Sequence, residues 1–345
     1  MQLAPVQAFS AGIRPNSYAA ALFAHNFNRK QAYMAYQRAT GIQVHSTLRK
    51  DEWEMLDAMV VESGKELLVG VQHLRNAPGL LRSESIAVSL AQYNKMSLMP
   101  PAMLSMNPLA DAERGRVDFT LAGVPVPFAF EDFQLDIRTM EASRRLGSSL
   151  DLTQGAEAAY QVALAWETLL FNGTPALAIT DRTNVLNTVY GYTTHPDRNT
   201  GVATGDWGDA ANGPLYALNT VQNMKRVLRT DRFYGPYWLY INDHNWADIG
   251  TVMSALNTRR VLEVLMADPE LTLVANSPRL DSGEIVMVDP KPRTVQWVEE
   301  AMIRPVEWDE KGGLGSNFRV IGAGAPLIKS TDVGQCGVAH FTQAT

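Results

Sequence analysis

The chain has 345 residues, of which 46% are hydrophobic and 19% charged, and its net charge is −6. A chain of this length can bury a large core, and its single cysteine, Cys336, excludes a disulfide framework. The acidic balance argues against a strongly basic nucleic-acid binder, and no apolar run in the sequence is long enough to span a membrane. The N-terminus lacks a signal-peptide pattern, so we expect a soluble protein made inside the cell.

The first fifty residues carry many aromatic side chains but little periodicity. Proline and glycine interrupt them, and the spacing allows a short helix over residues 17–39. An apolar surface of this kind rarely stays exposed on a monomer, so we expect the segment to dock on a neighbouring subunit. Its candidate contact residues are Phe23, Phe27, Tyr33 and Tyr36.

A helix and a long non-helical stretch are predicted next. Apolar residues recur at three- and four-residue steps from Asp51 to Arg75, which predicts a helix that ends before Pro78. Prolines exclude a long helix between residues 91 and 136. If this stretch forms a hairpin, legs of about 15 residues would reach about 50 Å, too far for the hairpin to bury itself. The pattern therefore implies a neighbouring molecule.

Methionines gather in the same non-helical stretch. Met is flexible and polarizable, which suits a contact with a variable partner, but Met also fills gaps in ordinary cores. The sequence leaves both interpretations open, and an extended segment with two phenylalanines follows. The candidate interface residues here are Met96, Met99, Met103, Met106, Phe128 and Phe130.

The rest of the chain is expected to form helices and then mainly strands. Helices are predicted over Thr153–Phe171, Pro214–Arg229 and His244–Met266, with a buried strand over Tyr237–Ile241. Short strands follow Pro269, and this segregation predicts an α+β fold rather than a doubly wound sheet. Their sequences are LTLVA, EIVMVDP, TVQWVEEAM, FRVIGAGAPLI and GVAHFT.

No catalytic or cofactor motif appears in the sequence. It has no P-loop, no dinucleotide-binding glycine motif, no HExxH and no GxSxG. His195 and His244 could pair with Asp197 or Asp243, but structural places in a loop and at a helix start are favoured. We therefore expect a protein that is not an enzyme, with no catalytic residue, no cofactor and no metal site.

Several segments resemble the shell proteins of one superfamily. Residues 123–173, from GVPVPFAF to ETLLFNG, resemble the extended loop and spine helix of encapsulins and of Hong Kong 97-type phage major capsid proteins. The most specific part is ETLLFNG, at Glu167–Gly173. Residues 234–253 and 284–341 are similar to the later strands and helix of that superfamily.

The resemblance implies an α+β protomer of the Hong Kong 97-type capsid fold with four parts. They are an N-terminal arm and helix (1–90), an extended loop (91–136), a peripheral domain with the spine helix (137–185 and 306–345) and an axial domain (186–305).

Three functions remain open at this point. The favoured one is a phage major capsid protein whose pentamers and hexamers close an icosahedral shell around double-stranded DNA. It implies a virion assembled in the bacterial cytoplasm, with scaffolding, portal or decoration proteins as further partners and no membrane. The roughly 90 residues before the loop favour it over an encapsulin shell around a cargo enzyme. The third interpretation is a soluble α+β enzyme with an undetected site.

The chain departs from some members of the superfamily in one respect. Those members cross-link a lysine of the extended loop to an asparagine of a neighbour. Here no lysine lies between Met96 and Asp136, and Lys95 stands at the edge of the loop. We therefore predict a non-covalent shell, and we expect removal of residues 1–40 to prevent or misdirect its assembly.

Overall fold

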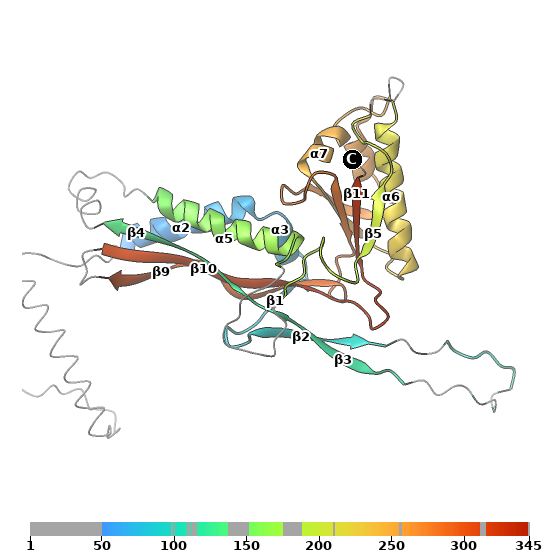
Figure 1. Ribbon diagram of the computed structural model, residues 1–345, viewed down its shortest axis with the longest axis horizontal. Coiled ribbons are helices and arrows are strands. Elements are labelled where there is room, and N and C mark those ends of the chain that lie inside the picture. The colour runs from blue at the N-terminus through green and yellow to red at the C-terminus, as the bar shows by residue number, and fades with distance from the viewer. Residues whose placement is uncertain are drawn as a thin grey trace, which may run out of the picture.

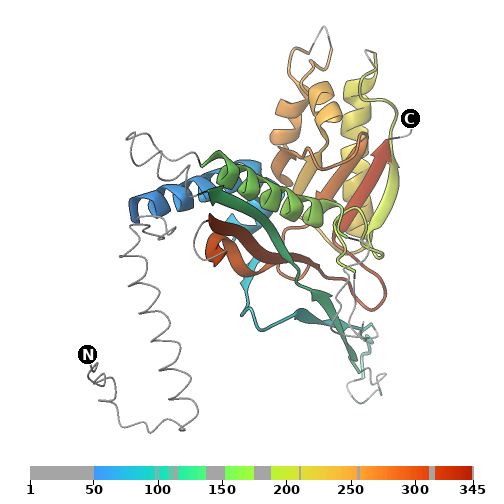
Figure 2. The same cartoon turned by 60° about the vertical axis from the view of Figure 1, so that its left-hand side comes forward.

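Two lobes and a projecting hairpin make up the described part of the molecule (Figure 1). One lobe is elongated and carries helices on a long sheet, and the other stands upright beside it (Figures 1 and 2). The residues that this computed structural model describes are 50–97, 99, 101–107, 109, 111, 116–136, 152–174, 188–209, 211–254, 257–310 and 315–343. The aromatic segment expected over residues 17–39 lies outside them.

The elongated lobe is built on a four-stranded sheet of order β1-β9-β10-β4. Its centre is the antiparallel pair β9 (Val295–Glu310) and β10 (Gly315–Ile328). Strand β4 (Phe128–Asp136) pairs antiparallel with β10, and the short β1 (Leu81–Ser83) adds in parallel to β9. Strands separated by more than 150 residues in the chain therefore meet in one sheet.

Two helices cover one face of this sheet. Helix α2 (Lys50–Leu67) and helix α5 (Thr153–Phe171) lie side by side on it (Figure 1). Small residues on α5 permit the close approach: a Cβ at Gly155 would come within 2.7 Å of Leu56 Cδ1. The core between helices and sheet contains Leu56, Val60, Leu135, Ala159, Val162, Phe318 and Val320.

Helix α5 matches its predicted range. Its N-cap residue is Leu152. At the other end the chain turns at Gly173, whose φ of 67° is the left-handed conformation that glycine adopts easily.

The single helix predicted from Asp51 to Arg75 is wrong, because the structure divides it. Helix α2 stops at Leu67, and helix α3 (Gly70–Asn76) starts after a break at Leu68 and Val69. A Cβ at Gly70 would lie 2.7 Å from Leu170 Cδ2, so glycine lets α3 pack against α5. Apolar spacing continues across the break, which is why the sequence suggested one helix.

The upright lobe holds a five-stranded mixed sheet of order β5-β11-β8-β6-β7. Helix α6 (Gly213–Thr230) packs against β11 and β5. The predicted strand over 237–241 and the later strands are present with small shifts at their ends. The five strands are β5 (Asn199–Ala203), β6 (Tyr237–Ile241), β7 (Leu271–Asn276), β8 (Glu284–Val288) and β11 (Val338–Gln343).

The long helix predicted over His244–Met266 is also wrong. The structure has two short helices, α7 (Asp243–Ile249) and α8 (Val261–Met266). The Asn242 side chain caps α7, because it accepts a hydrogen bond from the Asn245 N–H. Between the helices the chain folds back on itself through a bridge of Val252 with Arg260. Local backbone pairing replaces the helical turns that the apolar spacing allowed.

The Pro- and Met-rich stretch contains the expected hairpin. Strand β2 (Leu90–Met96) pairs antiparallel with β3 (Phe119–Pro125), and the pair projects from the body of the molecule (Figure 1). From β3 the chain passes through Val126 and Pro127 directly into β4.

The strands cross the expected domain boundaries. Strand β9 begins at Val295, inside the range expected for the axial domain, yet it joins the sheet beneath α5. Strand β11, from the range expected for the peripheral domain, joins the upright sheet. The four-part division stays a prediction. No helix among the described residues is long and apolar enough to cross a membrane.

Candidate assembly surfaces

The projecting hairpin has one apolar outward face. Residues opposite each other in an antiparallel ribbon share a face, so Met96 lies beside Phe119, and Leu121 follows on the same side. These three side chains are 48%, 65% and 62% exposed. Residues of the other face, such as Ala91 and Tyr93, pack towards the body. The described chain leaves the outward face uncovered.

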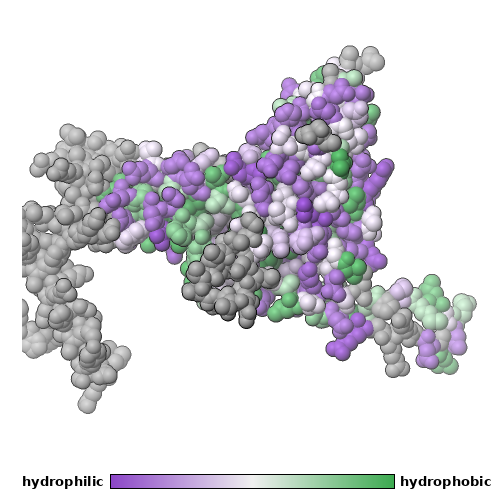
Figure 3. Space-filling model, in the orientation of Figure 1, coloured by the Kyte–Doolittle hydropathy of each residue, from purple (hydrophilic) through white to green (hydrophobic). Residues whose placement is uncertain are grey.

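The tip of the hairpin continues this surface. Met99 and Met103 are more than half exposed and Met106 is fully exposed, so they are not gap fillers of a core in this chain. Apolar residues at the end of the hairpin appear in green in Figure 3. Leu104 and Leu109 add to them, although the sequence did not single these two out. That these residues contact a neighbouring subunit stays a prediction.

Polar contacts hold the paired strands β2 and β3, here called the base of the hairpin, on the upright lobe at the end nearest the tip. Lys95 Nζ lies 3.3 Å from Asp197 Oδ2, and the Ser330 hydroxyl donates to the same oxygen at 2.6 Å. Burial alone would raise the pKa of Asp197, but the bonds from Ser330 and Lys95 lower it below its usual value. The backbone N–H of Asp332 also donates to Met96 O. The hairpin is therefore fixed where it leaves the body.

The sheet face opposite the helices carries a second exposed apolar patch. Along β4 the side chains alternate, so Phe133 packs with the helices while Phe128 and Phe130 point to the other face. Phe128 and Phe130 are 45% and 53% exposed. The structure places them on one face with three neighbours that the sequence analysis missed: Met302, Val306 and Trp308.

Arg319 organises this patch. Its guanidinium carbon lies 4.4 Å from the Phe130 ring centre and 5.3 Å from that of Trp308. Both carboxylate oxygens of Asp132 accept its hydrogen bonds at 2.6 Å, which lowers the pKa of Asp132. The Arg319 guanidinium thus keeps its hydrogen bonds to Asp132 while its flat face packs against the two aromatic rings.

A groove lies between α5 and the start of β4. Its volume is about 450 Å³, and its walls are mostly apolar. Strand β4 is an outer strand of its sheet, so its far edge has no strand partner among the described residues. The groove therefore combines an apolar wall with an open strand edge, the two features that an added peptide strand uses. Residues that line it include Pro127, Phe128, Ala129, Leu164, Ala165 and Leu169.

Glu167 is a buried carboxylate at the junction of α3 and α5. Its Oε1 accepts the Val71 N–H at 3.0 Å, so it occupies the start of α3. Burial raises the pKa of Glu167 to about 7, against the opposing effects of the backbone N–H groups and of Arg279. Sequence reasoning included this residue in a family motif but gave it no role, because a mid-helix glutamate is usually exposed.

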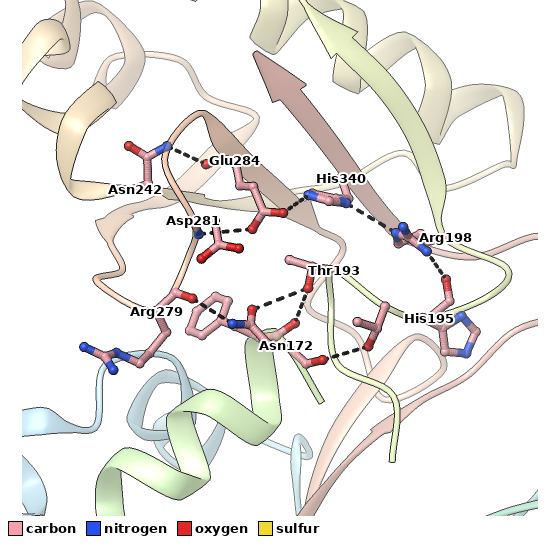
Figure 4. A network of polar contacts seen from close by, with 11 residues as sticks. Asn172, Thr193, His195, Arg198, Asn242, Arg279, Asp281, Glu284 and His340 are labelled. Atoms are coloured by element: carbon pink, nitrogen blue, oxygen red, sulfur yellow. Dashed lines mark hydrogen bonds and ion pairs between the residues drawn. The ribbon is translucent and has the colours of Figure 1, made fainter. Parts of the chain in front are cut away.

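A second polar network joins the upright sheet to the end of α5 (Figure 4). Arg198 Nε donates to His340 Nδ1 at 3.3 Å, and His340 Nε2 lies 3.2 Å from Glu284 Oε1. Because Nδ1 accepts, Nε2 carries the proton of the neutral ring. The Thr193 hydroxyl donates to Phe171 O at 3.0 Å and so ties the loop to α5. These contacts position strands and loops.

The histidines considered from sequence do not form a catalytic pair. His195 is buried, its Nδ1 accepts the Asp197 N–H, and burial lowers its pKa to about 4. The His244 side chain is exposed and lies 3.6 Å from Asp248, not beside Asp243. Within the described ranges no cluster of three His, Cys, Asp or Glu side chains could hold a metal ion.

Two sequence comparisons place these features among known proteins. The family model described as "Encapsulating protein for peroxidase" matches residues 43–189. The "Type 1 encapsulin shell protein EncA" of Myxococcus xanthus is 23% identical over 241 residues, which is 69% of this chain and 76% of that protein. These matches confirm the expectation of a structural protein rather than an enzyme.

The backbone of this chain also aligns with those of solved shell and capsid structures. The virus-like particle from Pyrococcus furiosus aligns with a TM-score of 0.61 at 14% identity, over 84% of this chain and 98% of its own. The capsid of Myoviridae Phage XM1 aligns with a TM-score of 0.58 at 10% identity, over 80% of this chain and 92% of its own. The capsid of a native GTA particle aligns with a TM-score of 0.53 at 11% identity, over 81% of this chain and 92% of its own. At such identities the likeness concerns the fold.

Proposed function

We propose that this chain, which has the Hong Kong 97-type capsid fold, is the shell protein of an encapsulin-type compartment that encloses a protein cargo. Copies of the chain would close an icosahedral shell in the cytoplasm of the cell that makes them. Its work would be assembly rather than catalysis.

The family-model match over residues 43–189 carries this proposal. That stretch contains α2, α3, the hairpin and α5. A chance likeness to one helix would not follow the chain through a break, a hairpin and a spine helix in the same order.

The apolar surfaces supply the physical reason for assembly. The outward hairpin face and the patch around Phe130 would cost free energy in water at about 25 cal/mol for each Å² left uncovered. Each interface in a closed shell can be modest, because every subunit makes several of them. The hairpin is the element best placed to reach a neighbour, since its far end extends beyond both lobes (Figure 1).

The test is to express the full chain alone and examine it by electron microscopy and sedimentation velocity. Closed particles tens of nanometres across are expected from assemblies of many such chains. A homogeneous monomer at micromolar concentration would contradict self-assembly. The contents are then compared by mass spectrometry and by the ratio of absorbance at 260 and 280 nm. Co-purified protein and little nucleic acid support the encapsulin interpretation.

The second candidate is the phage capsid protein that the sequence alone favoured. One observation still supports it: the chain has about 90 residues before the hairpin, including α2 and α3. The sequence matches, however, are to encapsulating and encapsulin proteins, and the likeness to phage capsids concerns the fold. We therefore place encapsulin first. Particles filled with double-stranded DNA would reverse this order.

A further inference from the structure

A cleft of about 370 Å³ opens where the hairpin meets the upright lobe. One wall is strand β2, the second is the corner between α6 and β6, and the third is the loop between β10 and β11. It is separate from the groove beside α5, and Met96 of the outward hairpin face lies at its wall. Residues that line it include Tyr93, Arg232, Phe233, Arg293, Lys329 and Thr331.

Positive charge in this cleft exceeds negative charge. Its lining holds Arg232, Arg293 and Lys329 but a single carboxylate, Asp231. That carboxylate already accepts hydrogen bonds from the Asn199 side chain at 2.8 Å and from the Cys336 backbone N–H at 3.4 Å. Asp231 is therefore already hydrogen-bonded within the protein, and three cations line the same cleft. A hollow lined by one sign of charge concentrates the electric field inside it.

Two of the three cations, Lys329 and Arg232, have no carboxylate partner among the described residues, and Arg293 has a long contact with a carboxylate that it shares. Lys329 Nζ donates to two neutral oxygens, Pro292 O and Gln296 Oε1, each at 2.7 Å. Burial and the charge of Arg82 lower the pKa of Lys329, as expected for a cation without an anion beside it. The Arg293 side chain lies 3.5 Å from the Asp289 carboxylate, which also forms an ion pair with Lys291. No carboxylate among the described residues pairs with Arg232.

The backbone and a hydroxyl also favour an anion. Arg232 has a φ of 66°, a left-handed conformation that a residue with a Cβ adopts at some cost. Beside it Arg293 stacks on Phe233, 5.1 Å from the ring centre. Thr331 Oγ1 accepts the Gln335 N–H at 3.1 Å, so its own hydrogen is free to donate. Two guanidinium groups, an ammonium and a hydroxyl are the donors that suit an oxyanion.

We propose that this cleft is a binding site for a free phosphate-type oxyanion, held by Arg232, Arg293, Lys329 and Thr331. The bound anion would supply the negative charge that the lining lacks. It would also join the hairpin base to the upright lobe, because the donors and Tyr93 come from different walls.

The test titrates inorganic phosphate into the purified full chain in chloride buffer, by calorimetry and ³¹P NMR. One saturable site per chain is expected. The substitution Arg232→Asn removes the charge while asparagine tolerates the left-handed backbone, and we expect about tenfold weaker binding, the usual effect of one charge-assisted hydrogen bond. Arg293→Gln is a second variant with the same expected direction.

The matched control is Arg226→Gln, an exposed arginine of α6 that does not line the cleft. It should leave the phosphate affinity unchanged, and an equal loss in this variant would overturn the proposal in favour of bulk charge. Absence of saturable binding would also overturn it. Binding that disappears in assembled particles would assign the cleft to an acidic group of a neighbouring copy instead. Particle formation is scored separately by microscopy, so failure of the shell proposal remains distinguishable.

Discussion

Glu167 of α5 binds the start of α3, at the break that separates α3 from α2. A peptide N–H at a helix start needs an acceptor, and here the acceptor is a carboxylate from α5 rather than a residue of α3. The carboxylate is buried, so its charge is costly, and its pKa is raised to about 7. Nearby ionisable groups include Tyr192 and Arg279. The contact between Glu167 and the start of α3 should therefore depend on pH.

We expect Glu167 to make folding stability depend on pH. Its folded pKa of about 7 lies above the usual 4.5, so the folded state binds a proton that the unfolded state has lost between these values. The free energy of unfolding should therefore fall as pH rises from about 4.5 to 7, by about 3 kcal/mol at most. In Glu167→Gln this contribution disappears while Oε1 can still accept the Val71 N–H. Thermal or urea unfolding at several pH values measures it.

The control for this experiment is Glu157→Gln, an exposed glutamate on the same helix. That variant should keep the wild-type dependence on pH. If Glu167→Gln keeps it as well, the carboxylate is not the group that titrates.

The ion pair of Lys95 with Asp197 should set how firmly the hairpin base is held. Both side chains are about a quarter exposed, so the pair contributes on the order of 1 kcal/mol. In Lys95→Met we expect faster amide hydrogen exchange in β2, measured by mass spectrometry. Lys95→Arg retains the charge and should exchange like the wild type. Equal exchange in all three proteins would mean that the backbone contacts hold the base alone.

At the scale of elements, prediction succeeded where local patterns decide the structure. Helix α5 has a continuous apolar stripe and a terminal glycine, and strand β6 is a short apolar run, so their ranges were predictable. The helices predicted over 51–75 and 244–266 were wrong because other contacts interrupt them: the tertiary contact of Glu167 at the first break, and the local bridge of Val252 with Arg260 at the second. Periodicity carries no information on such partners.

The outward face of the hairpin offers the sharpest test at this scale. The double substitution Phe119→Ser and Leu121→Ser removes two exposed apolar groups and should change the free energy of unfolding by about 0.5 kcal/mol or less. The same change should abolish or greatly reduce particle formation, as seen by sedimentation velocity. The control is Thr120→Ser, on the other face of the ribbon. Normal particles from the double variant would exclude this face from assembly.

At the scale of the whole molecule, the sequence predicted the parts better than their pairing. The hairpin, helix α5 and the closing strands were foreseen. Met96, Phe128 and Phe130 are exposed, and their role as contacts stays a prediction. The parallel pairing of β1 with β9 joins segments about 215 residues apart, and no local pattern signals it. The patch with Met302, Val306 and Trp308 was missed for the same reason, since it exists only after β9 and β4 join one sheet.

The assembled shell should be held by non-covalent contacts. Lys95 is bound to Asp197 at the base of the hairpin, and the sequence has no lysine between Met96 and Asp136. We therefore expect purified particles to give a single band near 38.0 kDa on denaturing electrophoresis without reducing agent. A ladder of multiples would contradict this and would point to a cross-link elsewhere in the chain.

The order of strands has a consequence for how the protein is made. Strand β4 pairs with β10, and β5 pairs with β11. Both early strands therefore depend on two late strands that lie within residues 315–343. On the ribosome neither sheet can close until residues 315–343 have been synthesised. Until then the nascent chain exposes its apolar hairpin and two unpaired strand edges, so we expect it to bind chaperones before it can assemble.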